Sequence, residues 1–168
     1  MIKNDQSYSV SIILPILNEI NSLKKTIKIL NKINVQKEYL IIYSERLTNN
    51  NVKKEIINLK KRNKNISYKS QLRPFVGGAI DLGIKLAKKN YIVIMASDLE
   101  TNPNELKNMI KVSKKNPKCI ISADRWISQK GFYNYGIIKF LANFFFQKLI
   151  KIFFKYKILD FTFAYRLY

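Results

Sequence analysis

The chain of 168 residues contains no histidine and only one cysteine, Cys119. Without histidine it cannot form a His-based metal site, a histidine general base or a Ser-His-Asp triad. A single cysteine cannot form a disulfide within the chain, which fits a reducing compartment. Cys119 lies in the apolar run CIISA, and we expect it to be a small residue of the core.

Acidic residues are also scarce, with 11 Asp and Glu against 31 Lys and Arg and a formal net charge of +20. Such a charge favours an anionic partner, which could be a nucleotide, a nucleic acid or an acidic membrane surface. An alternative explanation is AT-rich coding bias, because Lys, Ile and Asn are abundant throughout the sequence. Aromatic and basic residues do not alternate as in RNA-binding motifs, so nucleic acid is the least favoured partner.

The sequence also lacks a signal-peptide pattern and an uncharged apolar stretch long enough to cross a bilayer. We therefore expect a cytoplasmic protein. The most apolar segment lies near the C-terminus and is interrupted by lysines, which are Lys139, Lys148, Lys151, Lys155 and Lys157.

Residues 137–156 of this segment have the periodicity of a helix. Lys148, Lys151 and Lys155 fall in one narrow sector of the helical wheel. The apolar surface elsewhere on the wheel comes from Phe144, Phe145, Leu149, Ile152 and Phe153. This pattern is typical of an interfacial helix on anionic lipid. A core helix that packs on a sheet fits the pattern equally well.

Along the whole chain, short apolar runs alternate with longer helical patterns. The predicted strands are 9–14, 39–43, 66–69, 91–95 and 118–123, and the predicted helices are 22–33, 51–62, 77–89, 102–115 and 137–156. We expect Ser22 and Asn102 to be N-caps, with Pro103 in the first turn of its helix. The alternation predicts a single α/β domain over residues 1–168, with a mostly parallel sheet covered by helices on both faces.

Ligands of such sheets bind beyond the carboxyl ends of the strands. Four predicted strands are followed there by segments with at least one carboxylate, namely PILNE (15–19), SERLTNN (44–50), ASDLE (96–100) and DRW (124–126). Turn and cap formation by Asp and Asn would explain any one of these loops, but it explains four together less well.

Asp98 and Glu100 follow the strongest predicted strand. If the segment stays extended, both side chains point the same way. Two carboxylates on one side suit a hard divalent cation such as Mg²⁺, whose other ligands would be phosphates and water. The cation would neutralise a diphosphate leaving group. Alternatively, Glu100 favours the positive end of the predicted helix at 102–115.

Arg125 and the Gly77-Gly78 pair are two further candidates. Arg125 could clamp a phosphate with two hydrogen bonds, or form a surface pair with Asp124. The glycines at a helix start could approach a phosphate or a base closely, or form a tight turn. The sequence has neither a P-loop nor a G-x-G-x-x-G motif, so a dinucleotide site is unsupported.

Four segments occur in order along nearly the whole chain, namely SIILPILNEINSLKKTI, GGAIDLGIKLAKKNYIVIMASDLETNP, ISADRW and DFTFAYRLY. Together they resemble family 2 glycosyltransferases with the Rossmann-like GT-A fold, and most closely the polyprenyl-phosphate sugar transferase branch (dolichol-phosphate mannosyltransferase-like). The resemblance implies inverting, Mg²⁺- or Mn²⁺-dependent transfer from a nucleotide-diphosphate sugar to a polyprenyl phosphate or other membrane-linked acceptor. It also implies a peripheral location at the cytoplasmic face of the membrane.

The same resemblance assigns roles to residues. Those expected to bind the nucleotide sugar are Pro15, Leu17, Asn18, Glu19, Glu45, Gly78, Asp98 and Arg125. Asp98 would be the last Asp of the D-x-D motif and Glu100 a further metal ligand. Arg125 would contact the diphosphate or the acceptor phosphate, and with Asp98 it is the expected catalytic residue. Asp160 and Arg166 would lie on the acceptor side.

Three features depart from the family pattern. Ala96 replaces the first Asp of D-x-D, and Ser44 replaces the first Asp of an Asp-Asp pair whose second member corresponds to Glu45. The chain ends at Tyr168, where relatives continue, so we expect the C-terminal part of the usual domain to be missing. These departures support a second hypothesis, a family member that binds a nucleotide sugar or a partner without turnover.

The sequence shows no obvious extra general base, which favours a phosphate acceptor over a hydroxyl. A lipid phosphate is already an anion at neutral pH and needs no deprotonation. Asp124 and Asp160 stay open as bases for a hydroxyl acceptor.

Overall fold

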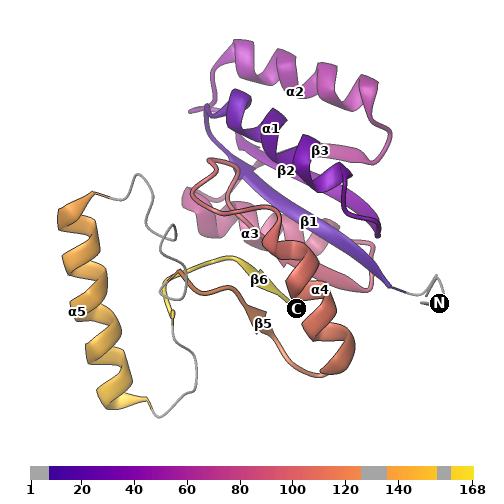
Figure 1. Ribbon diagram of the computed structural model, residues 1–168. Helices are drawn as coiled ribbons and strands as arrows, with labels where there is room; N and C mark the ends of the chain where they lie inside the picture. Colours follow the sequence, from indigo (N-terminus) through magenta and orange to yellow (C-terminus); the bar gives the residue numbers. More distant parts are fainter. Residues whose placement is uncertain (1–7, 126–135, 155–159) are drawn as a thin grey trace.

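The computed structural model describes residues 8–125, 136–154 and 160–168. A six-stranded sheet has the order β3-β2-β1-β4-β6-β5 (Figure 1). The strands are β1 (Ser9–Ile16), β2 (Gln36–Ser44), β3 (Ile66–Gln71), β4 (Tyr91–Ile94), β5 (Ile121–Ser122) and β6 (Arg166–Leu167). The helices are α1 (Ile20–Asn31), α2 (Asn50–Arg62), α3 (Phe75–Leu86), α4 (Glu105–Lys115) and α5 (Ile137–Phe153).

The sheet is mostly parallel. β1 pairs in parallel with both β2 and β4, and β2 pairs in parallel with β3. Only β6 runs antiparallel to its neighbours β4 and β5 among the described strands. The predicted α/β fold is therefore confirmed.

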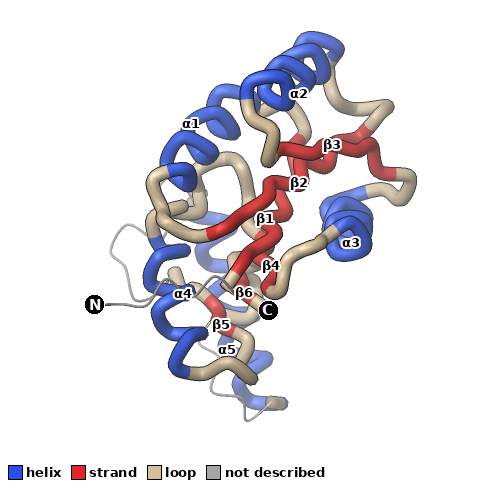
Figure 2. The backbone as a smooth tube through the Cα atoms, turned by 90° about the vertical axis from the view of Figure 1, so that its right-hand side faces the viewer, coloured by secondary structure: helices blue, strands red, loops and turns tan. Residues whose placement is uncertain are grey.

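Alternating side chains of β1 form two cores, one on each face of the sheet. Ile12 and Leu14 belong to the core shared with α1, α2 and α4, whereas Ile13 belongs to the core shared with α3. Figure 2 shows α3 on the opposite side of the sheet from α1 and α2. Gly83 lets α3 lie close to β1, since a Cβ there would be 2.5 Å from the Ile13 Cγ2 atom.

Both predicted N-caps are wrong. The N-cap of α1 is Glu19 rather than Ser22, and that of α4 is Asn104 rather than Asn102. The Asn102 Oδ1 atom instead accepts a hydrogen bond from the Asn104 backbone N–H at 3.1 Å, which forms a turn ahead of the helix. The helix therefore begins after Pro103.

The C-terminal strands differ most from prediction. β5 covers only Ile121–Ser122 of the predicted 118–123, and Cys119 is exposed rather than in the core. β6 has two residues and was not predicted. β6 lies between β4 and β5 because it pairs with both of them. Such pairing leaves no recognisable strand pattern in a sequence segment of two residues.

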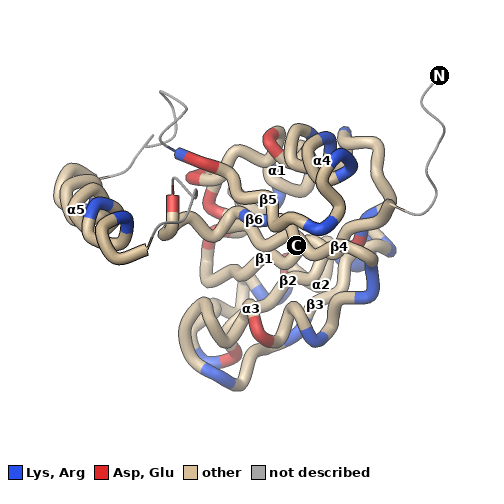
Figure 3. The backbone as a smooth tube through the Cα atoms, turned by 90° about the horizontal axis from the view of Figure 1, so that it is seen from below, with Lys and Arg blue, Asp and Glu red and all other residues tan. Residues whose placement is uncertain are grey.

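α5 lies to one side of the molecule, apart from the helices that cover the sheet (Figures 1 and 3). Its buried residues are polar, Asn143 and Gln147, so the prediction of a core helix on the sheet is wrong. Residues 155–156 of the predicted helix, with Lys155, lie outside the described residues. No helix within the described part of the chain is long and apolar enough to span a membrane.

Candidate functional site

A first cavity of about 470 Å³ opens at the carboxyl ends of the parallel strands. Its walls come from the segments after β1, β2 and β4, from the end of β3 and from the start of α3. This is where a parallel α/β sheet is expected to bind its ligand. Four of the predicted nucleotide-binding residues line it, namely Pro15, Leu17, Glu19 and Asp98.

Glu19 and Asn18 shape the loop after β1. The Glu19 Oε2 atom accepts hydrogen bonds from the backbone N–H groups of Leu17 and Asn18, at 2.9 and 2.8 Å. The Asn18 Oδ1 atom accepts a hydrogen bond from the Asn49 backbone N–H at 2.9 Å, which ties this loop to the one after β2. Asn18 does not line the first cavity, so its contact with the cavity is indirect.

Glu45 and Gly78 also lie outside the lining of the first cavity. The Glu45 carboxylate is exposed and pairs with the Lys53 ammonium at 2.6 Å, and this hydrogen bond lowers the pKa of Glu45. A Cβ on Gly78 would lie 2.4 Å from the Arg73 carbonyl oxygen. Gly78 thus lets the backbone of α3 lie close to the preceding turn at Arg73. This agrees with the alternative role of the glycines in a tight turn, which the sequence left open.

Phe75 is a cavity residue that the sequence did not reveal. It begins α3 with a φ of 63°, its side chain is 83% exposed, and it lines the first cavity. A positive φ is uncommon for a bulky residue, and such strain concentrates at ligand sites. Sequence reasoning had no signal here, because positive φ is expected for Gly, Asn or Asp.

A second cavity of about 370 Å³ adjoins the first. Ala96 and Ala164 line both cavities. The polar residues of the second cavity are Glu100, Thr101, Arg125, Lys139 and Thr162. The α5 residue Lys139 was not predicted, because only the tertiary fold brings it to the sheet edge.

The segment of Asp98 and Glu100 does not stay extended, which was the condition for their side chains to point the same way. β4 ends at Ile94, and Leu99 has a φ of 68°, so the segment turns instead of staying extended. The Asp98 Oδ1 atom accepts a hydrogen bond from the Glu100 backbone N–H at 3.0 Å within this turn. As a result, Asp98 lines the first cavity and Glu100 lines the second.

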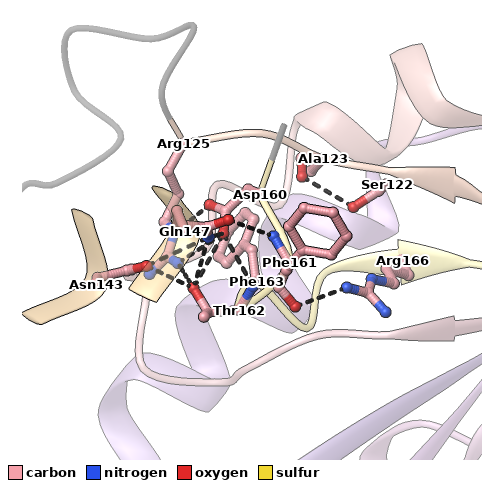
Figure 4. Close-up of polar contacts among 10 residues, drawn as sticks. All are labelled: Ser122, Ala123, Arg125, Asn143, Gln147, Asp160, Phe161, Thr162, Phe163 and Arg166. Carbon is pink, nitrogen blue, oxygen red and sulfur yellow. Dashed lines mark hydrogen bonds and ion pairs between the residues drawn. The ribbon is translucent and has the colours of Figure 1, made fainter. Parts of the chain in front are cut away.

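Arg125 is buried and forms a two-point ion pair with Asp160 (Figure 4). Its Nη2 atom also donates to the Thr162 hydroxyl at 2.7 Å, and its guanidinium lies 4.6 Å from the centre of the Phe163 ring. Arg125 therefore has a carboxylate partner 35 residues away in the sequence.

Asp160 is the centre of this network and is 1% exposed. Besides Arg125, it accepts hydrogen bonds from the Gln147 side chain at 2.7 Å and from the Phe163 backbone N–H at 3.1 Å. Burial alone would raise the pKa of Asp160. The hydrogen bonds from Arg125, the charge of Arg125 and the hydrogen bonds from Thr162 together hold that pKa below its usual value. Such a carboxylate is a weak proton acceptor.

Arg166 and Asp124 line neither cavity. The Arg166 Nη2 atom donates to the Phe161 carbonyl oxygen at 2.9 Å, which fastens the loop before β6 (Figure 4). Arg166 thus supports the segment that forms one wall of the second cavity.

A scan against protein families matches residues 11–168 to "Glycosyl transferase family 2". The chain belongs to glycosyltransferase family 2. A search of curated proteins finds no match for this family 2 chain.

Solved structures share the GT-A fold with this family 2 chain. They include the mannosyltransferase PcManGT from Pyrobaculum calidifontis in complex with GDP-Man and Mn²⁺, with a TM-score of 0.60 and 16% identity over 77% of this chain and 39% of that one. S. aureus TarS 1–349 has a TM-score of 0.55 and 14% identity, and the match covers 67% of this chain and 34% of TarS. A CMP:2-keto-3-deoxy-manno-octonic acid synthetase in complex with CTP has a TM-score of 0.51 and 6% identity, and the match covers 72% of this chain and 55% of the synthetase.

At these identities the likeness shows the fold alone. The chain spans less than half the length of the mannosyltransferase and of TarS. The narrower resemblance to the polyprenyl-phosphate branch stays a prediction.

The family 2 D-x-D position allows a test of whether the residues present suit a metal ion. By the resemblance, Ala96 stands where the family has the first carboxylate, and the described residues contain no group of three or more His, Cys, Asp or Glu that could hold a metal. Asp98 is exposed and has no ion pair among the described residues, although the chain carries 31 Lys and Arg. A cation at this place would need phosphate or water oxygens for most of its ligands, because the chain offers few carboxylates there.

Proposed function

We propose that this chain transfers a sugar from a nucleotide-diphosphate sugar in the first cavity to an acceptor in the second cavity. The observation that carries the proposal is the junction of the two cavities at Ala96 and Ala164. Transfer needs the donor and the acceptor to be held side by side, and adjoining cavities at one sheet edge supply that proximity. We propose that the transfer inverts the anomeric carbon, as the resemblance to family 2 implies.

The first cavity has the chemistry of a nucleotide site. Leu17 and Phe75 supply apolar surface for a base, and Asp98 is two residues along the chain from Ala96, which lines both cavities. We propose that the donor's diphosphate lies near Asp98, with the sugar toward the junction. The relative PcManGT binds GDP-Man with Mn²⁺, which is consistent with this arrangement.

We propose Mg²⁺ or Mn²⁺ as the cofactor, with Asp98 as its protein ligand; Glu100, which the sequence suggested as a further ligand, lines the neighbouring cavity instead. When bound, such a cation stabilises the negative charge of the departing diphosphate. The chain's own contribution is to orient the donor, and the turn at Leu99 fixes the direction of both carboxylates.

A phosphate-bearing acceptor suits the second cavity best. Arg125 is paired with Asp160 and Glu100 also lines this cavity, but Lys139 has no carboxylate partner among the described residues and is available to an anionic acceptor. A phosphate acceptor needs no general base, and Asp160 is poorly suited to be one because its pKa is lowered and its oxygens accept several hydrogen bonds. We therefore propose a polyprenyl phosphate or another membrane-linked phosphate, as in the polyprenyl-phosphate branch, used at the cytoplasmic face of a membrane.

A second candidate is binding of a nucleotide sugar without turnover. Ala96 and Ser44 favour it, because both line the first cavity where the family has carboxylates. The two candidates agree on the donor and differ on the metal and on the product.

Thermal unfolding with UDP- and GDP-sugars, with and without Mg²⁺ or Mn²⁺, tests both. Metal-dependent stabilisation and transfer of labelled sugar to a short polyprenyl phosphate support the enzyme. Stabilisation without metal and without product supports the binding candidate. The absence of any response to nucleotide sugars contradicts both.

A further inference from the structure

The amphipathic character of α5 is inverted relative to a core helix. The side chains that it buries are Asn143 and Gln147, while Ile138 is 82% exposed, Phe145 66% and Ile152 76%. Helices of globular proteins normally turn their apolar stripe toward the core. α5 turns its polar stripe inward and leaves its apolar stripe uncovered by any described residue.

Specific hydrogen bonds hold the helix in this orientation. The Gln147 side chain donates to Asp160 at 2.7 Å and accepts from the Phe161 backbone N–H at 3.0 Å (Figure 4). Turning the apolar stripe inward would break these bonds and leave the buried Asp160 short of a donor. The exposed stripe is therefore a built feature of the fold.

We define the outer face of α5 as its exposed apolar residues, which are Ile137, Ile138, Leu141, Phe145, Phe146, Leu149, Ile152 and Phe153. Helical periodicity puts Lys148 and Lys151 along one border of this face and Lys139 along the other. Lys148 folds its ammonium over the Phe144 ring at 4.7 Å from the ring centre. A wide apolar face with lysines on both borders is the pattern of a helix that lies in a membrane interface.

Charge decides between lipid and a second copy of the chain. Residues 126–159 contain no Asp or Glu, and α5 shows only basic charges in Figure 3. Two copies that met through this face would bring their lysines together, each chain carrying a net charge of +20. We infer that the outer face of α5 docks the chain on an anionic lipid surface, with its aromatic and aliphatic side chains among the acyl chains and its lysines at the headgroups.

Vesicle sedimentation tests this inference on the whole chain without any nucleotide sugar. We expect binding to vesicles of equal parts phosphatidylcholine and phosphatidylglycerol, and much weaker binding to phosphatidylcholine alone. Phe145→Ser with Ile152→Ser should lower affinity for the anionic vesicles at least about tenfold. Lys148→Glu with Lys151→Glu should lower it at least about twentyfold, since each lysine near the surface contributes about fivefold.

Matched controls change the same residue types elsewhere. Leu72→Ser with Ile120→Ser removes exposed apolar side chains, and Lys54→Glu with Lys61→Glu reverses exposed charges on α2, which Figures 1 and 2 show far from α5. The first control should bind as the unmodified chain does, and the second should lose much less affinity than Lys148→Glu with Lys151→Glu. Circular dichroism should show all variants folded, because every changed side chain is exposed.

Three results would overturn the inference. The α2 charge variant could lose as much affinity as the α5 charge variant, which would assign binding to bulk charge. The chain could ignore anionic vesicles, or it could form a dimer that Phe145→Ser with Ile152→Ser abolishes, which would assign the face to a second copy. Vesicle binding without any response to nucleotide sugars would keep this inference and contradict the proposed function.

Discussion

The Arg125 guanidinium donates hydrogen bonds to both carboxylate oxygens of Asp160, from Nε at 2.8 Å and from Nη2 at 3.1 Å. The pair joins the end of β5 to the loop that precedes β6, and Gln147 extends it to α5. One buried carboxylate thus holds three segments around the second cavity.

Removing this carboxylate should destabilise the fold strongly. We expect Asp160→Ala to lower the free energy of unfolding by about 3–5 kcal/mol, because it leaves the buried Arg125 charge without a partner. Urea unfolding followed by circular dichroism measures the loss. Asp81→Ala removes the exposed pairs with Lys85 and Arg73 and should have little effect. Equal losses in the two variants would contradict the structural role of Asp160.

The same ion pair predicts a dependence of stability on pH. The pKa of Asp160 is lower in the folded chain than in the unfolded one, so its contribution is fully present above the unfolded value of about 4. That contribution should disappear as the pH falls from about 5 through the lower, folded pKa. Urea unfolding at a series of pH values should show a smaller acid loss for Asp160→Asn than for the unmodified chain, and identical losses would contradict the prediction.

The sequence predicted the parts of the fold that depend on local pattern. β1 and β2 were found because long apolar runs between helical patterns leave few other structures open. The site was predicted less well. Asp98 lines the first cavity at the strand end where the sequence suggested a ligand, but the turn at Leu99 separates it from Glu100, and a positive φ at leucine has no sequence signal. The role of Asp160 depends on a partner 35 residues away, which no local pattern shows.

The two adjacent glycines of α3 should respond oppositely to alanine. A Cβ on Gly78 would lie 2.4 Å from the Arg73 carbonyl oxygen, whereas a Cβ on Gly77 would meet nothing within 4 Å. Gly78→Ala should therefore lower the free energy of unfolding by about 1–3 kcal/mol through overpacking. Gly77→Ala should raise it by up to about 1 kcal/mol, because alanine favours the helix. Thermal unfolding measures both effects. Unfolding temperatures of the two variants that shift in the same direction would contradict this prediction.

Lys139 should govern the use of an anionic acceptor. We expect Lys139→Gln to lower the rate of transfer to a short polyprenyl phosphate about tenfold, because it would remove the charge-assisted hydrogen bond that we propose between Lys139 and the acceptor phosphate. Stabilisation by the nucleotide sugar should not change, since Lys139 does not line the first cavity. The exposed Lys107 on α4 lines neither cavity, so Lys107→Gln is the matched control. A parallel loss of donor binding in Lys139→Gln would contradict the separation of the two cavities.

Asp98 and Ala96 should change the response to metal in opposite directions. Asp98→Asn removes the one carboxylate that the D-x-D segment presents to the first cavity, so the metal-dependent part of nucleotide-sugar stabilisation should vanish. Ala96→Asp adds a carboxylate where both cavities meet, so half-maximal stabilisation should need at least about tenfold less Mn²⁺. Titrations of Mn²⁺ at fixed nucleotide sugar, read by thermal unfolding, measure both shifts. Glu105→Gln serves as the control, because Glu105 lines neither cavity. A metal response that survives Asp98→Asn would remove this residue from the metal site, and the donor's diphosphate would then have to be neutralised by the chain's own basic groups.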